Sequence, residues 1–205
     1  MPEFRPCGEH AWLLDLDDNR MVHRWAAAVR AADLDGVREV VPGMSTLLVT
    51  FDPGLTNASA LRAALDAVHP GADLADDDDQ HVVDVRYDGA DLQDVAELTG
   101  LTAAEVIAAH TESVWTVAFC GFAPGFSYLV GGDPRLYVPR RDAARVRVPA
   151  GAVALAGAFS AIYPRVSPGG WQLLGHTDAV LWNSDADPPA VLRPGAVVRF
   201  RDVGR

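Results

Sequence analysis

Glycine, proline, aromatic and arginine residues gather in four clusters in the second half of the sequence. Glycine takes backbone angles closed to other residues, so a glycine beside an aromatic residue lets the chain approach another surface closely. Arginine can bind a carboxylate or phosphate through two parallel hydrogen bonds. Loops of this composition can hold an anionic ligand against apolar walls, or they can form the corners of a β-barrel. The clusters cover residues 121–129, 133–141, 148–157 and 163–177.

Arginine supplies every side-chain cation of this chain other than histidine, because the sequence contains no lysine. Chemistry that requires lysine, such as a Schiff base or a P-loop, is therefore excluded. The arginines near the clusters can bind a ligand, or they can form surface ion pairs with the acidic first half of the chain. These arginines are Arg135, Arg140, Arg141, Arg147 and Arg165.

Nucleophilic and metal-dependent catalysis find little support in the sequence. The segment Gly125–Leu129 lacks the final glycine of a nucleophile elbow, and the six histidines include no His-Glu-x-x-His pattern. The two cysteines, Cys7 and Cys120, lie far apart and form no Cys-x-x-Cys motif. We therefore expect no metal site and two reduced thiols in a cytosol, with Cys120 as a core residue.

Charge divides the chain into two unequal halves. The net charge of −11 argues against nucleic-acid binding, which requires many cations. Residues 1–110 contain 7 arginines against 21 acids, whereas residues 111–205 contain 10 arginines against 7 acids. The acidic run Asp76–Asp79 is typical of a solvated loop rather than of a metal site. No apolar run is long enough for a membrane span and no secretory signal is evident, so we expect a cytoplasmic protein.

The first half alternates between strand and helix patterns. Ala11–Leu16 is a short apolar strand, and the apolar residues after it recur at helical spacing. Val37–Val41 and Thr46–Phe51 are β-branched runs separated by a turn, a second helix follows at Ala58–Val68, and residues 81–87 alternate like a strand. The order predicts a ferredoxin-like βαββαβ domain.

The second half is rich in short β segments broken by glycine and proline, which is typical of a barrel or sandwich. Between the halves, residues 91–98 and a segment opened by the capping box of Thr102 and Glu105 are predicted to be helical. We therefore expect an α+β protein with domains at 1–88 and 114–205 and a helical connector at 89–113. The expected strands of the second domain are residues 114–120, 145–148, 153–155, 171–174, 179–182 and 197–200.

In these clusters the sequence resembles the family of 5-oxoprolinase B subunits, also called the KipI-like or allophanate hydrolase subunit 1 family. The resemblance rests on motifs that occur in order over nearly all of residues 114–182. They are Gly-Phe-x-Pro-Gly-Phe-x-Tyr-Leu, Asp-Pro-Arg-Leu, Pro-Arg-Arg, Val-Pro-Ala-Gly, Ile-Tyr-Pro and Ser-Pro-Gly-Gly-Trp.

The resemblance implies a ferredoxin-like domain followed by a cyclophilin-like β-barrel. It also implies a heteromeric hydrolase, completed by A and C subunits, that uses ATP with Mg to convert 5-oxo-L-proline to L-glutamate, the isolated chain being inactive. Related domains occur in the carboxyltransferase part of urea carboxylase, and one member of the family inhibits a sensor histidine kinase. The alternatives are therefore a regulatory protein and a subunit related to allophanate hydrolase or urea carboxylase.

Two segments depart from the usual family pattern. His176 stands where relatives commonly have arginine, so a titrating group replaces a permanent cation. Residues 157–161 lack the polar side chains and one glycine of the usual segment. Both departures fall in loops that we expect to hold ligand.

The candidate site combines arginines for charge, aromatic residues for apolar walls and glycines for close backbone approach. These are binding roles, and no residue is predicted as general base. The candidate substrate-binding residues are Phe122, Pro124, Gly125, Phe126, Tyr128, Arg140, Arg141, Arg147, Tyr163, Ser167, Gly169, Gly170, Trp171 and His176.

Overall fold

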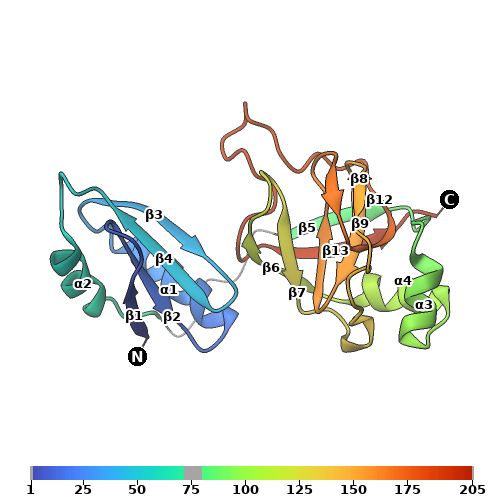
Figure 1. Ribbon diagram of the computed structural model, residues 1–205, viewed down its shortest axis with the longest axis horizontal. Coiled ribbons are helices and arrows are strands. Elements are labelled where there is room, and N and C mark those ends of the chain that lie inside the picture. Colours follow the sequence, from blue (N-terminus) through green and yellow to red (C-terminus); the bar gives the residue numbers. More distant parts are fainter. Residues whose placement is uncertain (1, 72–79, 205) are drawn as a thin grey trace. The chain divides into compact units, whose positions relative to one another are not determined.

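Two compact units make up the chain, Met1–Asp77 and Asp78–Arg205. A computed structural model describes residues 2–71 and 80–204 (Figure 1). The acidic run at 76–79, predicted as a solvated loop, lies outside the described residues. We call the two units the N-terminal unit and the C-terminal unit.

Four antiparallel strands and two helices form the described part of the N-terminal unit. The strands lie in the order β1-β2-β4-β3. Asp18 caps the first helix by accepting a hydrogen bond from the Met21 amide at 2.7 Å. The helices pack on the sheet through buried residues such as Leu14, Trp25 and Leu61. The elements are β1 (Glu3–Pro6), β2 (Ala11–Asp15), α1 (Asn19–Ala31), β3 (Val37–Pro42), β4 (Thr46–Phe51) and α2 (Ala58–Asp66).

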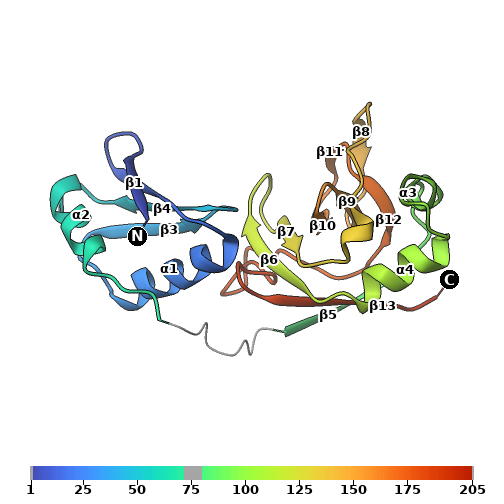
Figure 2. The ribbon, with the colours of Figure 1, turned by 90° about the horizontal axis from the view of Figure 1, so that it is seen from below.

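The predicted βαββαβ order is wrong in its last strand. β5 (Gln80–Val85) pairs in parallel with β13 (Val197–Asp202) in the C-terminal unit, as Figure 2 shows. In the N-terminal sheet, β1 instead takes the edge beside β2, where Arg5 and Asp15 form an ion pair at 2.8 Å. The described order in this unit is therefore ββαββα.

Seven strands form the main sheet of the C-terminal unit, in the order β12-β9-β10-β7-β6-β13-β5. The two edge strands meet where the backbones of Arg86 and His176 exchange two hydrogen bonds of 2.9 Å. This contact nearly closes the sheet into a barrel, and β8 and β11 form a separate ribbon. The remaining strands are β6 (Trp115–Cys120), β7 (Ser127–Val130), β8 (Arg145–Val148), β9 (Ala152–Ala156), β10 (Phe159–Ile162), β11 (Ser167–Gly169) and β12 (Gln172–His176).

Closure of the barrel depends on glycine. A Cβ atom at Gly175 would lie 2.1 Å from the backbone oxygen of Arg86, a distance that no side chain can occupy. The chain can therefore bring β12 against the end of β5 only because residue 175 lacks a side chain. This architecture confirms the predicted α+β class with a cyclophilin-like β-barrel.

Two helices predicted as a connector belong to the C-terminal unit. α3 (Leu92–Thr99) packs against β12 and α4 (Ala103–Glu112) packs against β13. The Thr102–Glu105 capping box opens α4 as predicted. Because β5 precedes both helices and joins the barrel, the chain divides near residue 78 and not at the expected boundary of 88.

The expected strand at 179–182 is also absent from the described residues, where only an isolated bridge joins Trp182 to Ala190. No helix among the described residues has both the length and the apolar composition needed to cross a bilayer.

Candidate functional site

An aromatic cavity of about 340 Å³ lies on the barrel beside the loop before β8. Its wall combines aromatic rings, small residues and one arginine, so it presents apolar surface with a single cation. The wall residues are Tyr128, Tyr137, Pro139, Arg140, Ala156, Gly157, Phe159 and Trp171.

Buried aromatic rings support the wall of the aromatic cavity. Phe126 and Tyr163 are each 1% exposed. The Phe126 ring makes edge contacts with Tyr128, Tyr163 and Trp171, with centroids 5.0–5.7 Å apart. Such edge-to-face pairs are worth about 0.5–1.5 kcal/mol each beyond their buried area. The cavity wall is therefore held by a rigid aromatic layer.

Arg140 is the exposed cation of this cavity. It forms no side-chain hydrogen bond or ion pair within residues 2–71 and 80–204. Its charge nevertheless acts on the buried phenol of Tyr163: burial raises the pKa of Tyr163, and Arg140 offsets part of that rise. Arg140 is thus available to an anionic ligand at the edge of an apolar cavity.

Asp91 anchors the loop that presents Arg140. Its side chain is 2% exposed and accepts hydrogen bonds from Arg141 and Arg145 at 2.6 Å each. Its second oxygen accepts from the amide of Leu173 on β12 at 2.7 Å. Buried charges require such compensation. Arg141, predicted as a ligand residue, therefore also fixes the loop.

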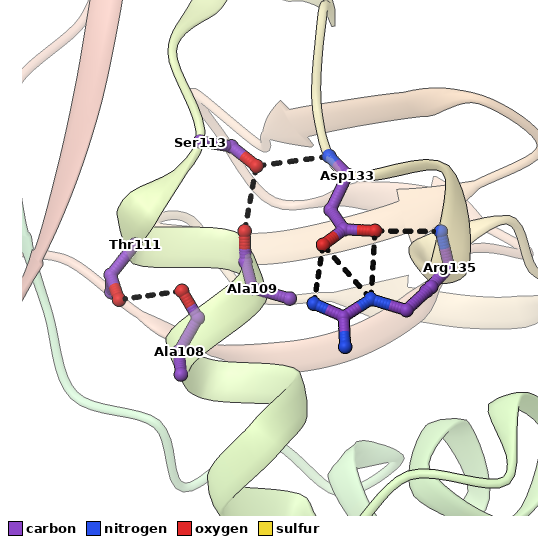
Figure 3. Close-up of polar contacts among 6 residues, drawn as sticks. All are labelled: Ala108, Ala109, Thr111, Ser113, Asp133 and Arg135. Atoms are coloured by element: carbon purple, nitrogen blue, oxygen red, sulfur yellow. Dashed lines mark hydrogen bonds and ion pairs between the residues drawn. The ribbon is translucent and has the colours of Figure 1, made fainter.

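Arg135 is held by its own motif, as Figure 3 shows. Asp133 caps the short 3-10 helix Pro134–Leu136 by accepting from the Arg135 amide, and it binds the Arg135 guanidinium at 2.6–3.0 Å. The Asp133 amide donates in turn to Ser113 Oγ at 2.9 Å, at the end of α4. The Asp-Pro-Arg-Leu motif therefore joins two elements of the fold.

Arg147 and His176 line a different cavity of about 460 Å³. There His176 Nδ1 lies 2.8 Å from Asp88 Oδ1. The structure therefore separates these two predicted residues from the aromatic cavity, which takes Tyr128, Arg140 and Trp171 from the predicted set.

The predicted glycines shape the loops. They line neither the aromatic cavity nor the cavity of Arg147 and His176. Gly125 has a φ of 77°, and a Cβ there would lie 2.8 Å from Cβ of Trp182. At Gly169 a Cβ would lie 2.2 Å from the Tyr163 hydroxyl. Gly170 accepts a hydrogen bond from the Arg141 amide at 2.8 Å.

The other predicted residues also lie outside these walls. Phe122 is 60% exposed with a φ of 67° and touches Phe126, with centroids 5.2 Å apart. Pro124 is exposed in the same turn, and Ser167 begins β11.

Sequence reasoning missed Asp91 and most of the wall of the aromatic cavity. Tyr137 lies between two recognised motifs, and Phe159 lies in the segment noted only for its departure from the family pattern. Nothing local marks Asp91 among the many acids of the first half, because its partners lie 50 or more residues away.

Cys120 is not suited to nucleophilic catalysis. Burial raises the pKa of the Cys120 thiol, which lies 3.4 Å from Ser127 Oγ. Within the described ranges, no three His, Cys, Asp or Glu side chains gather in a group that could hold a metal ion.

The chain has a fold of the carboxyltransferase type. The family described as carboxyltransferase domain, subdomain C and D, matches residues 2–192. The 5-oxoprolinase B subunit of Escherichia coli O157:H7 is 38% identical over 186 residues, covering 86% of this chain and 83% of that protein. The 5-oxoprolinase B subunit of Bacillus subtilis strain 168 is 33% identical, covering 89% and 82%. The chain belongs to the family of 5-oxoprolinase B subunits.

Solved structures share this architecture. The protein TTHA0988 has a TM-score of 0.84 and 34% identity, and the match covers 98% of this chain but 40% of TTHA0988. This chain thus spans less than half of that longer protein. Urea carboxylase of Kluyveromyces lactis, at 20% identity and a TM-score of 0.75 over 98% of this chain and 22% of that enzyme, shows the same fold.

Proposed function

We propose that this chain is the lactam-binding component of an ATP-dependent 5-oxoprolinase that converts 5-oxo-L-proline to L-glutamate together with A and C subunits. The observation that carries the proposal is the aromatic cavity with Arg140 at its edge. Membership of the family of 5-oxoprolinase B subunits supports it.

The chemistry of 5-oxo-L-proline matches the aromatic cavity. Its five-membered ring presents apolar faces that pack on Tyr128, Phe159 and Trp171, and its carboxylate pairs with Arg140. Opening the lactam requires activation of a resonance-stabilised amide. The role of this chain is to bind and orient the ring.

ATP does not fit the residues of the aromatic cavity. A triphosphate with Mg requires several cationic or backbone donors, whereas this cavity offers one arginine. We therefore assign ATP use to the assembled complex and derive no step through ATP in this chain. The A and C subunits supply the remaining groups in this proposal.

Arg140→Gln tests the proposal in the assembled enzyme. Because a charge-assisted hydrogen bond contributes about 1.5–3 kcal/mol, we expect kcat/KM for 5-oxo-L-proline to fall by about ten-fold to one-hundred-fold. The measurement is ATP hydrolysis dependent on 5-oxo-L-proline, after co-expression with the A and C subunits. Melting curves establish that the variant is folded, as expected for an exposed side chain.

Arg165→Gln is the matched control, because Arg165 is exposed and lies outside the aromatic cavity. Its kinetics should equal those of the unchanged protein. Equal kinetics of the Arg140 variant, or a folded complex of all three components that lacks this activity, would contradict the proposal.

A regulatory role is the competing function, and one observation favours it. Phe122 is an exposed aromatic residue held at a positive φ, and such a residue is suited to anchor a protein partner. Capture of a sensor histidine kinase by the purified chain, with neither the A nor the C subunits captured, would favour regulation over the enzyme.

A further inference from the structure

A second cavity shares Pro139 and Arg140 with the aromatic cavity. Its volume is about 580 Å³, and we call it the polar cavity. It lies between α3, the loop before β8 and the start of β12. The wall residues are Asp94, Glu97, Leu98, Pro139, Arg140, Arg141, Asp142, Ala143 and Gln172.

The polar cavity is lined by three acids and two arginines, and Asp142 comes from the same loop as the arginines. Asp94 and Glu97 are three residues apart on α3 and therefore lie on one face of that helix. Arg140 and Arg141 come from the loop. Asp94 and Arg141 lie 3.8 Å apart, whereas neither Glu97 nor Arg140 forms an ion pair within the described part of the chain.

Two buried polar atoms in this wall have no partner among the described residues. Gln172 is 5% exposed; its Nε2 donates to the Pro139 carbonyl at 3.2 Å, but its Oε1 accepts no hydrogen bond. Arg141 Nη1 donates to Asp91, but its Nε donates to no atom. Buried polar groups are nearly always hydrogen-bonded. A free acceptor and a free donor in one wall therefore indicate a ligand that has both.

We propose that the polar cavity binds a free α-amino acid as its zwitterion. The ammonium group lies at Glu97, Asp94 and Gln172 Oε1, and the α-carboxylate lies at Arg140 with Arg141 Nε. The choice of L-glutamate as the amino acid rests on the proposed function. Ring opening creates an ammonium group that the lactam lacks, so the product gains partners in the polar cavity that the substrate does not have. Arg140 belongs to both cavities and can hold a carboxylate on either side.

Calorimetric titration of the purified full-length chain with L-glutamate tests the proposal without partners or ATP. We expect saturable binding that is lost with N-acetyl-L-glutamate, whose amide nitrogen carries no charge. Glu97→Gln should weaken L-glutamate binding about ten-fold. Glu112→Gln removes the same charge from α4, outside the polar cavity, and should leave that binding unchanged.

Two outcomes would overturn the amino-acid site: N-acetyl-L-glutamate binding as tightly as L-glutamate, or no saturation by L-glutamate at millimolar concentration. A parallel titration with 5-oxo-L-proline tests the proposed lactam-binding function separately. If Glu97→Gln weakens the binding of L-glutamate and the chain does not bind 5-oxo-L-proline, the result supports the amino-acid site and contradicts the lactam-binding role.

Discussion

At the residue scale, the arginines divide into those that hold the fold and those that are free for a ligand. Asp91 forms ion pairs with Arg141 and Arg145, and Asp133 forms an ion pair with Arg135. Arg140 lies beside this network and forms no ion pair with the described residues. Because the loop is fixed through Arg141, the neighbouring Arg140 is presented to both cavities without a partner of its own.

Asp91→Asn should therefore destabilise the protein strongly. The change leaves two guanidinium groups facing a neutral side chain in a buried position, which costs about 3 kcal/mol. Urea unfolding measures the free energy of unfolding. Asp94→Asn is the control: its carboxylate is 60% exposed, so we expect a change below about 0.5 kcal/mol. Equal effects of the two substitutions would show that Asp91 is not the anchor of the loop.

At the scale of elements, β5 decides where the C-terminal unit begins. Its six residues pair with β13 along its whole length, and Val83 and Val85 are buried in the core of the barrel. The contact of Arg86 with His176 then joins the two edges of the sheet. A barrel without this strand exposes β13 along one edge and loses two core side chains.

A polypeptide of residues 80–205 should consequently fold by itself, whereas one of residues 89–205 should not. Burial of each valine contributes about 1.5–3 kcal/mol, a large share of the stability of a domain of this size. Circular dichroism and urea unfolding distinguish a cooperative transition from its absence. If the shorter polypeptide unfolds cooperatively and is as stable as the longer one, the domain boundary lies at residue 88 instead.

At the scale of the whole molecule, one buried histidine couples stability to pH. His110 is fully buried between Tyr87 and Ser160, with ring nitrogens 2.7 and 2.8 Å from their hydroxyl oxygens. Burial lowers the pKa of His110 to about 3. Between pH 6.5 and pH 3 the unfolded chain therefore binds a proton at this residue, whereas the folded chain does not.

The contribution of neutral His110 to the free energy of unfolding should therefore be fully present above pH 6.5 and should fall as the pH decreases towards 3. The slope corresponds to about 1.4 kcal/mol per pH unit for one proton, or about 2 kcal/mol at pH 5. Urea unfolding at several pH values between 7 and 5 measures this slope. His110→Asn removes the titrating group, so the variant should be less stable at pH 7 but show a shallower slope. An unchanged slope in the variant would assign the pH dependence to other groups.

The sequence alone determined most elements of this protein and the family to which it belongs. Caps and periodicity are local, so the helix after Asp18 and the capping box at Thr102 could be predicted from neighbouring residues. β7 escaped prediction because glycine-rich motifs on either side of it resemble loops, and β10 because it is a short strand between Gly157 and Pro164.

Only the tertiary structure decided which strand β5 joins and which arginines remain free. Strand pairing depends on the edge that is open, and β1 already occupies the edge of the N-terminal sheet beside β2. The state of each arginine depends on acids such as Asp91, 50 residues from Arg141 in the chain. Local patterns specify backbone conformation, whereas partners distant in sequence are selected by packing of the whole unit, which no short stretch of residues encodes.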